Sequence, residues 1–343
     1  MSSSVIVFLI SFVLGVFLTP TFRLIALRLA ILDKPSNRKI QTEPVPYLGG
    51  IAVLLAVFLS LFAASKFESS WTRQHPEGWI ILLVSLMVLL VGLIDDFVPV
   101  NYKFKLIFQV TTSLLLTFYL GTTSTRVSLV ETDWINVCAT ALLLVFFMNA
   151  INFFDNWNGA TAITIGSSSL FLGILMFNNS QNFLGSVSFA ISGALMGFLP
   201  WNFPKAKIFL GDAGTLFIGF LLGVLAIRYN PTGSSNFISV FQIFATFFVP
   251  LADCSLVILF RILRKVNPAT PGKDHLSHRL FLLGLDYSLI PLLFFLLNLA
   301  SFTAALLITK ALWFSICILF FLFVSLFKIY WRTANLSRRF PAL

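Results

Sequence analysis

Two neighbouring carboxylates, Asp95 and Asp96, end the apolar stretch LVGLIDDF, and Lys103 and Lys105 follow shortly after them. Adjacent acidic residues at a membrane boundary have two interpretations: a solvated helix end, or a site for a divalent cation or a proton transfer that faces a polar cavity. The pair by itself leaves both interpretations open.

The segment NAINFFDNWNGATA contains a second group of polar side chains. Asn149, Asn152 and Asp155 are spaced three apart, so on a helix they form one polar stripe. Such a stripe either bonds neighbouring helices within a bilayer, or holds the hydroxyls, base edge or metal of a ligand.

Asp212 belongs to a third group, FLGDAGT, which follows a loop that carries Asn202, Lys205 and Lys207. One interpretation is that Asp212 only caps a helix. Small residues on both sides, two nearby cations and a helix N-terminus also suit a phosphate bound through a metal ion. We favour this second interpretation.

Two basic loops complete the candidate chemistry. PGKDHLSHRLFLLG contains Asp274, His275, His278 and Arg279. Zinc needs three or four close ligands, so contact of the histidines and the arginine with phosphate or a lipid headgroup is favoured instead. The first loop, DKPSNRKIQTEPVPYLGG, contains Lys39 among prolines that oppose helix formation. An anionic ligand would suit that loop, but ordinary positive-inside charge explains it at least as well.

Membrane helices must position all these residues, because 58% of the 343 residues are hydrophobic, only 10% are charged and the mean hydropathy is +0.95. These values exclude an ordinary soluble globular domain. Apolar windows of the length that crosses a bilayer recur along the whole chain. They predict an all-α, polytopic integral membrane protein with about 10–11 transmembrane helices. The predicted spans are 4–22, 47–65, 79–94, 106–121, 134–151, 161–177, 185–201, 211–228, 237–259, 287–308 and 311–329.

Charge distribution predicts the orientation of these spans. A cytoplasmic first loop puts 18 of the 23 Lys and Arg residues on the cytoplasmic side, with the N-terminus outside and the C-terminus cytoplasmic. The same topology puts 9 of the 13 acidic residues there, which the positive-inside rule does not predict. The net charge of +10 lies in short loops beside helices, so membrane lipids and a phosphorylated substrate are expected partners and nucleic acid is not.

No linker rich in Pro, Gly or Ser divides the chain. We therefore expect one polytopic membrane domain over 1–343, with cytoplasmic active-site loops near 31–50, 95–105, 152–160, 202–214 and 261–282. The pairs Gly193 with Gly197 and Gly219 with Gly223 have the spacing that lets helix backbones approach closely in a bilayer.

Taken in order, the five motifs resemble the polyprenyl-phosphate N-acetylhexosamine-1-phosphate transferases, that is, glycosyltransferase family 4. This family includes relatives of phospho-N-acetylmuramoyl-pentapeptide transferase and of undecaprenyl-phosphate GlcNAc-1-phosphate transferase. The resemblance runs from about residue 20 to 285. It covers DKPSNRK, the paired aspartates, the Asn and Asp stripe, FLGDAGT and HLSHRL, while Asp253, before Arg261, also fits the family pattern or caps a polar pocket.

The resemblance implies transfer of a sugar 1-phosphate, with N-acetylglucosamine 1-phosphate favoured, from a UDP-sugar to a membrane polyprenyl (undecaprenyl) phosphate, with release of UMP. This would be the first lipid-linked step of a cell-envelope polysaccharide such as a cell-wall polymer or lipopolysaccharide. The implied location is the bacterial inner (plasma) membrane with a cytoplasmic active site, and a homodimer is left open. The implied cofactor is Mg2+, with Mn2+ as an alternative, held by Asp212 and Asp95.

The remaining roles that the resemblance implies fall into two groups. The catalytic group comprises Asp95, Asp96, Asp155, His275 and His278. The substrate-binding group comprises Lys39, Lys103, Lys105, Asn149, Asn152, Asn158, Asn202, Phe209 and Arg279, in which Asn202 and Phe209 match positions that hold the uridine. Which of Asp95 and Asp96 is the base and which the metal ligand is left open.

Four residues depart from the family pattern. Gln41 stands where many members have His, Asn156 where Gly is common, Asn158 where most have Asp, and Ser277 where a further His is frequent. These changes keep a second hypothesis open, a catalytically impaired relative that binds lipid or nucleotide. A transporter is less favoured because the acidic groups gather at one membrane face, whereas a transport path needs polar groups near the midplane.

Overall fold

The computed structural model describes residues 2–33, 43–66, 78–121, 133–231, 236–270 and 272–339. Almost all of its secondary structure is helical. The elements are α1 (Ser2–Arg28), β1 (Leu32–Asp33), β2 (Val45–Pro46), α2 (Gly49–Ser65), α4 (Gly78–Phe97), α5 (Tyr102–Gly121), α6 (Asp133–Phe154), α7 (Ala160–Asn178), α8 (Asn182–Asn202), α9 (Gly211–Arg228), α10 (Asn236–Thr246), α11 (Phe248–Leu263), α12 (Leu276–Leu282), α13 (Leu289–Leu307) and α14 (Leu312–Arg339).

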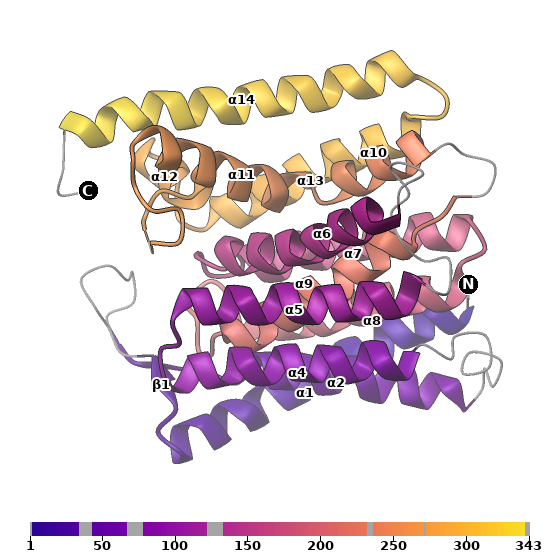
Figure 1. Ribbon diagram of the computed structural model, residues 1–343. Coiled ribbons are helices and arrows are strands. Elements are labelled where there is room, and N and C mark those ends of the chain that lie inside the picture. Colours follow the sequence, from indigo (N-terminus) through magenta and orange to yellow (C-terminus); the bar gives the residue numbers. More distant parts are fainter. Residues whose placement is uncertain are drawn as a thin grey trace.

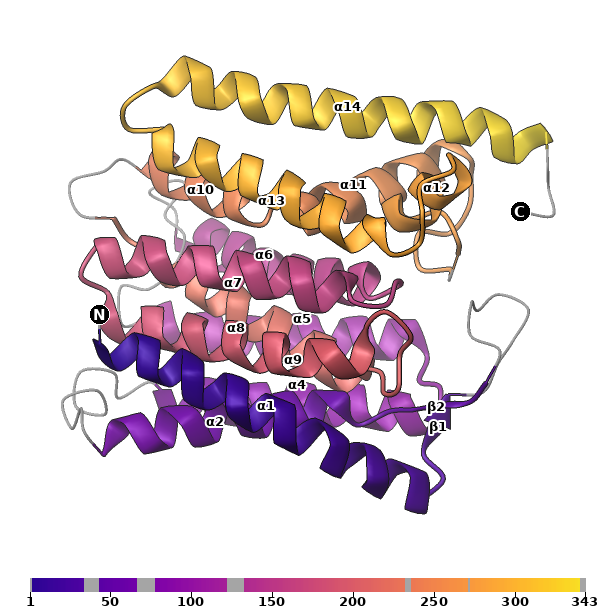
Figure 2. The same ribbon diagram turned by 180° about the vertical axis from the view of Figure 1, so that it is seen from behind.

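The long helices lie side by side and run from one end of a bundle to the other (Figures 1 and 2). The start of α1 lies at one end, whereas the end of α14, the antiparallel β1–β2 pair and α12 lie at the opposite end. Consecutive long helices alternate in direction when the bent pair α10–α11 is counted as one span. The loops after α1, α4, α6, α8 and α11 therefore gather at the end that carries β1 and β2, which we call the loop end.

Each predicted span overlaps a helix, which confirms the predicted all-α, polytopic class. Within the described ranges, eight helices are long and apolar enough to cross a membrane, and the bent pair α10–α11 would make a ninth. The two-residue strands β1 and β2 are an addition that the helical pattern did not predict.

The prediction of one continuous helix over 237–259 is wrong, because α10 and α11 meet at an angle of 83°. Pro250 lies in the first turn of α11 and has no N–H to donate to the carbonyl of Thr246. Ser168 of α7 donates its hydroxyl to that carbonyl at 2.8 Å instead. The break is thus satisfied by a neighbouring helix, as broken membrane helices require.

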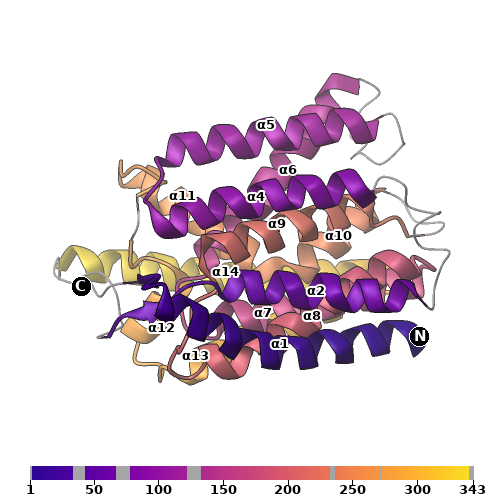
Figure 3. The same ribbon diagram turned by 90° about the horizontal axis from the view of Figure 1, so that it is seen from below.

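α9 lies in the middle of the bundle and packs against α2, α4, α6 and α8 (Figure 3). Nearly all its side chains are buried, as expected for a helix that is apolar on every side. Close approach of helices is confirmed at both predicted glycine pairs. A Cβ on Gly193 would lie 2.3 Å from the Phe8 carbonyl of α1, and one on Gly219 would lie 2.6 Å from Met148 Cα of α6.

Candidate functional site

The paired aspartates end α4, and Asp212 lies in the first turn of α9. Asp96 accepts hydrogen bonds from the backbone N–H groups of Asp212 (2.8 Å) and Ala213 (3.1 Å). A carboxylate from α4 therefore caps α9, where unpaired N–H groups and the helix dipole favour negative charge. Asp212 is not the N-cap residue, so its side chain is available for other contacts.

Gly211 makes this contact between helices possible. Its φ of +75° lies in the left-handed region, and a Cβ there would lie 2.5 Å from Asp96 Oδ2. The small residue beside Asp212 in the sequence is therefore explained by the close approach of Asp96 and by backbone conformation.

Lys105, on α5, forms ion pairs with both Asp95 and Asp212. Its Nζ lies 2.7 Å from Asp95 Oδ2 and 2.8 Å from Asp212 Oδ2. Burial lowers the pKa of Lys105, but the negative charges and hydrogen bonds of Asp212 and Asp95 outweigh that effect and raise it. A fully charged ammonium thus lies between the two carboxylates.

The three polar residues predicted to form one stripe, Asn149, Asn152 and Asp155, do not all face the same place. Asn152 donates to Asp212 Oδ1 at 3.0 Å and to Thr215 at 2.9 Å, so it orients the carboxylate of Asp212. Asn149 instead donates to Gln109 of α5 at 2.6 Å and does not line the cavity described below. Asp155 follows the last helical residue and does line it.

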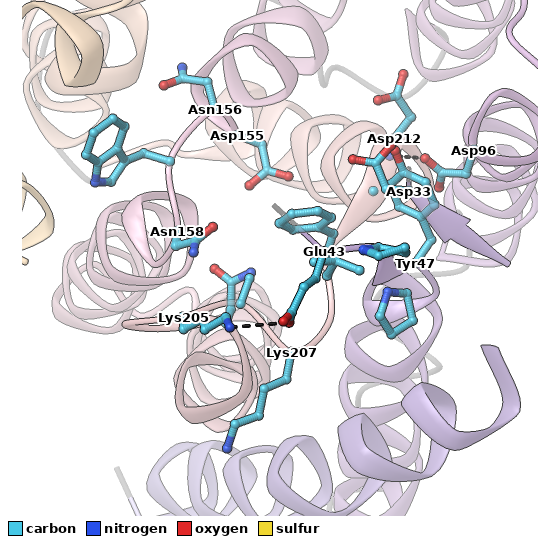
Figure 4. Close-up of a pocket in the computed structure, with 18 of the residues that line it drawn as sticks. Asp33, Glu43, Tyr47, Asp96, Asp155, Asn156, Asn158, Lys205, Lys207 and Asp212 are labelled. Carbon is cyan, nitrogen blue, oxygen red and sulfur yellow. Dashed lines mark hydrogen bonds and ion pairs between the residues drawn. The ribbon is translucent and has the colours of Figure 1, made fainter. Parts of the chain in front are cut away.

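Asp96, Asn152, Asp155 and Asp212 line a cavity of about 1080 Å³ at the loop end. Lys105 contacts Asp212, but neither Lys105 nor Asp95 is among the lining residues. Figure 4 shows Asp96, Asp155 and Asp212 around it, and Lys205 paired with Glu43. The lining residues come from the first loop, from the ends of α1, α4, α6, α8, α9 and α12, and from the loops after α6, α8, α11 and α12: Arg23, Leu27, Asp33, Glu43, Pro44, Val45, Pro46, Tyr47, Asp96, Asn152, Asp155, Asn156, Trp157, Asn158, Asn202, Pro204, Lys205, Ala206, Lys207, Phe209, Gly211, Asp212, Gly272, Lys273, His278 and Tyr287. The volume suits a ligand of nucleotide-sugar size.

Asp155 and His278, which both line this cavity, have shifted pKa values. Burial and the negative charge of Asp212 raise the pKa of Asp155 to about 6. Burial and the nearby His275 lower the pKa of His278 to about 4. At neutral pH, Asp155 is an ionised carboxylate close to its titration range, while His278 is a neutral imidazole that can form hydrogen bonds.

The pKa of Asp155 predicts a pH dependence. We expect the rate of reaction at saturating substrate to fall as the pH is lowered through about 6, because Asp155 takes up a proton and loses its ability to accept one. An Asp155→Asn variant should be slower and should lack this acidic limb. Rate profiles of both proteins across that pH range test the prediction, and an identical acidic limb in the variant would contradict it.

Aromatic side chains that the sequence did not single out form one wall of the cavity. Trp157 donates its Nε1–H to the Tyr287 carbonyl at 3.2 Å, and its ring lies 4.5 Å from that of Tyr287 and 5.5 Å from that of His278, between centroids. Trp157 stands inside the motif NAINFFDNWNGATA, and Lys273, also missed, stands inside PGKDHLSHRLFLLG. The motifs therefore contained these residues, but only contact with the cavity distinguishes them from packing residues.

Two of the departures from the family pattern contact each other. Ser277 of α12 donates its hydroxyl to Asn156 Oδ1, which ties the loop after α6 to α12. Asn158 lines the cavity and donates to the Pro204 carbonyl at 3.2 Å. Gln41 lies outside the described residues.

Asn202 and Phe209 line the cavity and also shape its backbone. Asn202 accepts from Gly159 N at 2.7 Å and donates to the Ile208 carbonyl at 3.1 Å. The Phe209 backbone bonds Pro46 and Gly49, which joins the first loop to the start of α9. Both residues therefore hold neighbouring loops together around the cavity.

Several predicted site residues lie away from the cavity. His275 and Arg279 are buried, with partners on α11 and α14, and do not line it. Lys103 is exposed and also does not line it. Lys39 lies outside the described residues.

The carboxylates around Asp212 fit a magnesium ion that takes most of its ligands from the substrate and from water. Within the described part of the chain, no group of three or more His, Cys, Asp or Glu side chains could hold a metal ion. Mg2+ commonly uses only one or two carboxylates and takes its other ligands from substrate phosphates and water. Asp95 and Asp212 are two carboxylates that already face one cation, the Lys105 ammonium.

Comparison of the chain with known proteins identifies the family to which it is similar. A profile of the family described as Glycosyl transferase family 4 matches residues 78–230. A probable undecaprenyl-phosphate N-acetylglucosaminyl 1-phosphate transferase of Bacillus subtilis is 28% identical over 333 residues, covering 93% of this chain and 89% of that protein.

Two further relatives extend the comparison. The decaprenyl-phosphate N-acetylglucosaminephosphotransferase of Mycobacterium leprae is 30% identical over 318 residues, covering 84% of this chain and 80% of that protein. The phospho-N-acetylmuramoyl-pentapeptide-transferase of Wolbachia pipientis is 27% identical over 245 residues, covering 64% and 73%. The chain belongs to glycosyl transferase family 4.

Proposed function

We propose that this protein transfers N-acetylglucosamine 1-phosphate from UDP-N-acetylglucosamine to a membrane polyprenyl phosphate, undecaprenyl phosphate in the first instance, and releases UMP. The observation that carries the proposal is the meeting of Asp95, Asp96 and Asp212 with Lys105 and Asn152. Three of these residues, Asp96, Asn152 and Asp212, line the cavity. The relatives named for transfer to undecaprenyl or decaprenyl phosphate support the choice of sugar and acceptor.

The reaction joins two anions, so the site must neutralise charge before the acceptor oxygen approaches phosphorus. An oxygen of the lipid phosphate attacks the phosphorus that bears the sugar, a new P–O bond forms, and the bond to the UMP oxygen breaks. Mg2+, or Mn2+ in its place, held by Asp212 and Asp95, would supply positive charge to the phosphate oxygens. Lys105 supplies further positive charge at the same place, and Asn152 keeps Asp212 oriented.

The two other carboxylates have separate roles in this proposal. Asp96 already accepts two backbone N–H groups, so it positions the first turn of α9. Asp155 lines the cavity with a pKa of about 6, which suits a group that takes the proton of a phosphate acceptor near neutral pH. We therefore assign the base to Asp155, and metal ligation to Asp212 and Asp95.

We further propose a single membrane domain with about 10–11 transmembrane helices, its N-terminus outside and its loop end in the cytoplasm of a bacterial inner membrane. The charge bias supports this orientation, since the topology predicted from the sequence puts 18 of the 23 Lys and Arg residues on the cytoplasmic side. The start of α1 and the end of α14 lie at opposite ends of the bundle, which agrees with an odd number of crossings (Figure 1). Apolar side chains exposed on α14 and α5 suit contact with lipid.

The experiment that tests the function measures UMP release by the purified protein with UDP-N-acetylglucosamine, undecaprenyl phosphate and Mg2+. We expect UMP and a lipid-linked sugar phosphate to form together in equal amounts, and neither to form when the lipid is omitted. Parallel reactions with other UDP-sugars identify the donor. Binding of UDP-sugar without UMP release from any donor would favour the impaired relative and contradict the proposal.

A further inference from the structure

The segment from Gly272 to Arg279 reaches the cavity through only part of its side chains. Gly272, Lys273 and His278 line the cavity, while Asp274, His275 and Arg279 turn toward the protein interior. The inward-facing groups are bonded almost completely. The orientation of the outward-facing groups therefore depends on what holds the inward-facing ones.

Two buried residues of α11 bind the first half of this segment. Arg261 bonds both carboxylate oxygens of Asp274, at 2.6 and 2.9 Å, and the Pro268 carbonyl at 2.6 Å. Asp253, only 1% exposed, lies 2.9 Å from His275 Nδ1 and accepts from Leu276 N at 2.6 Å. This arrangement is tight because charge-assisted hydrogen bonds are strong in a poorly solvated interior.

The last helix, α14, supplies the remaining partners. Tyr330 donates its hydroxyl proton to Asp253 Oδ1, and its ring lies 4.1 Å from the guanidinium carbon of Arg279. Thr333 accepts from Arg279 Nη1 at 2.6 Å. Tyr330 and Thr333 are 0% and 2% exposed, although only 11% of the membrane-spanning window of α14 is buried. Buried polar groups are thus concentrated where this peripheral helix meets the segment that borders the cavity.

We infer that α14 is a positioning element of the active site, in which Tyr330 and Thr333 hold the segment 272–279 so that Lys273 and His278 face the cavity. The expected effect on KM for the UDP-sugar rests on the proposed function. Lys273 is a cation suited to a diphosphate, and His278 belongs to the aromatic wall with Trp157, so their displacement weakens binding of the nucleotide sugar. Binding of the lipid acceptor along apolar helix surfaces is affected less.

The test uses conservative substitutions in the full-length protein. Tyr330→Phe keeps the ring over Arg279 and removes only the hydroxyl, while Thr333→Val keeps the shape and removes the acceptor. Each should raise KM for the UDP-sugar about tenfold, as expected for one lost hydrogen bond to a buried charged group, with a much smaller change in KM for the polyprenyl phosphate. Thr333→Ser retains the hydroxyl and should restore wild-type values.

Ser325→Ala is the matched control on the same helix, because the Ser325 hydroxyl is exposed and bonds only the Phe321 carbonyl within α14. A second readout does not depend on catalysis. Trypsin cleavage after Lys273 should be faster in Tyr330→Phe and Thr333→Val than in wild type, Thr333→Ser or Ser325→Ala, since a released segment reaches the protease more often.

The outcomes separate the two proposals. A rise in KM for the UDP-sugar together with faster cleavage after Lys273 supports the positioning role of α14. Unchanged KM and cleavage, or equal losses toward both substrates with a lower thermal midpoint, overturn it. If the wild-type protein releases no UMP from any UDP-sugar, the proposed function fails, and the cleavage rates alone decide whether α14 holds the segment.

Discussion

Replacing Asp212 with asparagine should lower the rate of sugar-phosphate transfer by about a hundredfold to a thousandfold, the usual effect of removing one electrostatic contact to a reacting group. The substitution keeps the size of the side chain and its hydrogen bond from Asn152 at the Oδ1 position. It removes the charge that faces Lys105 and that would hold the metal ion. The loss should therefore appear in kcat, measured as UMP release with saturating substrates and Mg2+.

Asp133→Asn is the matched control for this variant. Asp133, like Asp212, lies in the first turn of a helix, but it begins α6 at the opposite end of the bundle. Its rate should stay within a factor of about three of wild type, as for a substitution remote from the site. If Asp212→Asn transferred sugar phosphate as fast as Asp133→Asn, the metal would not bind at Asp212. Thermal midpoints equal to that of wild type would show that both variants fold.

Replacing Lys105 with methionine should lower two measured quantities, the rate at saturating Mg2+ and the Mg2+ concentration that gives half-maximal activity. The rate at saturating Mg2+ should fall about a hundredfold, because one cation beside the reacting phosphates is lost. The Mg2+ concentration that gives half-maximal activity should also fall, because Asp95 and Asp212 no longer share the Lys105 ammonium and attract the metal more strongly. Activity measured against Mg2+ concentration reports both effects in one titration.

Lys265→Met provides the comparison for a lost positive charge at the same end of the bundle, since Lys265 is exposed and does not line the cavity. Its half-saturating Mg2+ concentration should equal that of wild type. A Lys105→Met protein that needs more Mg2+ instead of less would mean that Lys105 helps to hold the metal through the substrate and does not compete with it. That result would contradict the prediction that the Lys105 ammonium competes with Mg2+ for Asp95 and Asp212.

The sequence predicted well those features that depend on local pattern. Apolar length located the helices, because a span without water must satisfy its backbone hydrogen bonds internally. Asp95 and Asp96 were expected at a helix end and Asp212 at a helix start, and both placements are confirmed. The break before Pro250 was missed, although the proline was visible, because proline also occurs inside continuous membrane helices, as Pro200 does in α8.

The roles of individual residues were less predictable. Asp96 and Asp212 are both acidic residues at helix ends, but Asp96 caps the other helix while Asp212 remains free to bind Lys105. His275 and Arg279 stand in the same motif as His278, yet only His278 borders the cavity. Residues one or three positions apart on a short helix point in different directions, and the positions of α11 and α14 decide which direction is buried.

The sequence by itself therefore determined the membrane class, the helical segments, the motifs of the family and the gathering of acidic and basic residues at one end of the bundle. These properties follow from composition, periodicity and spacing along the chain. Only the tertiary structure decided which residues meet across the chain: Lys105 between Asp95 and Asp212, Asp96 on α9, and α14 on the segment that carries His278. Hydrogen bonds and ion pairs depend on distances of a few ångströms between side chains from distant segments, and only helix packing sets those distances.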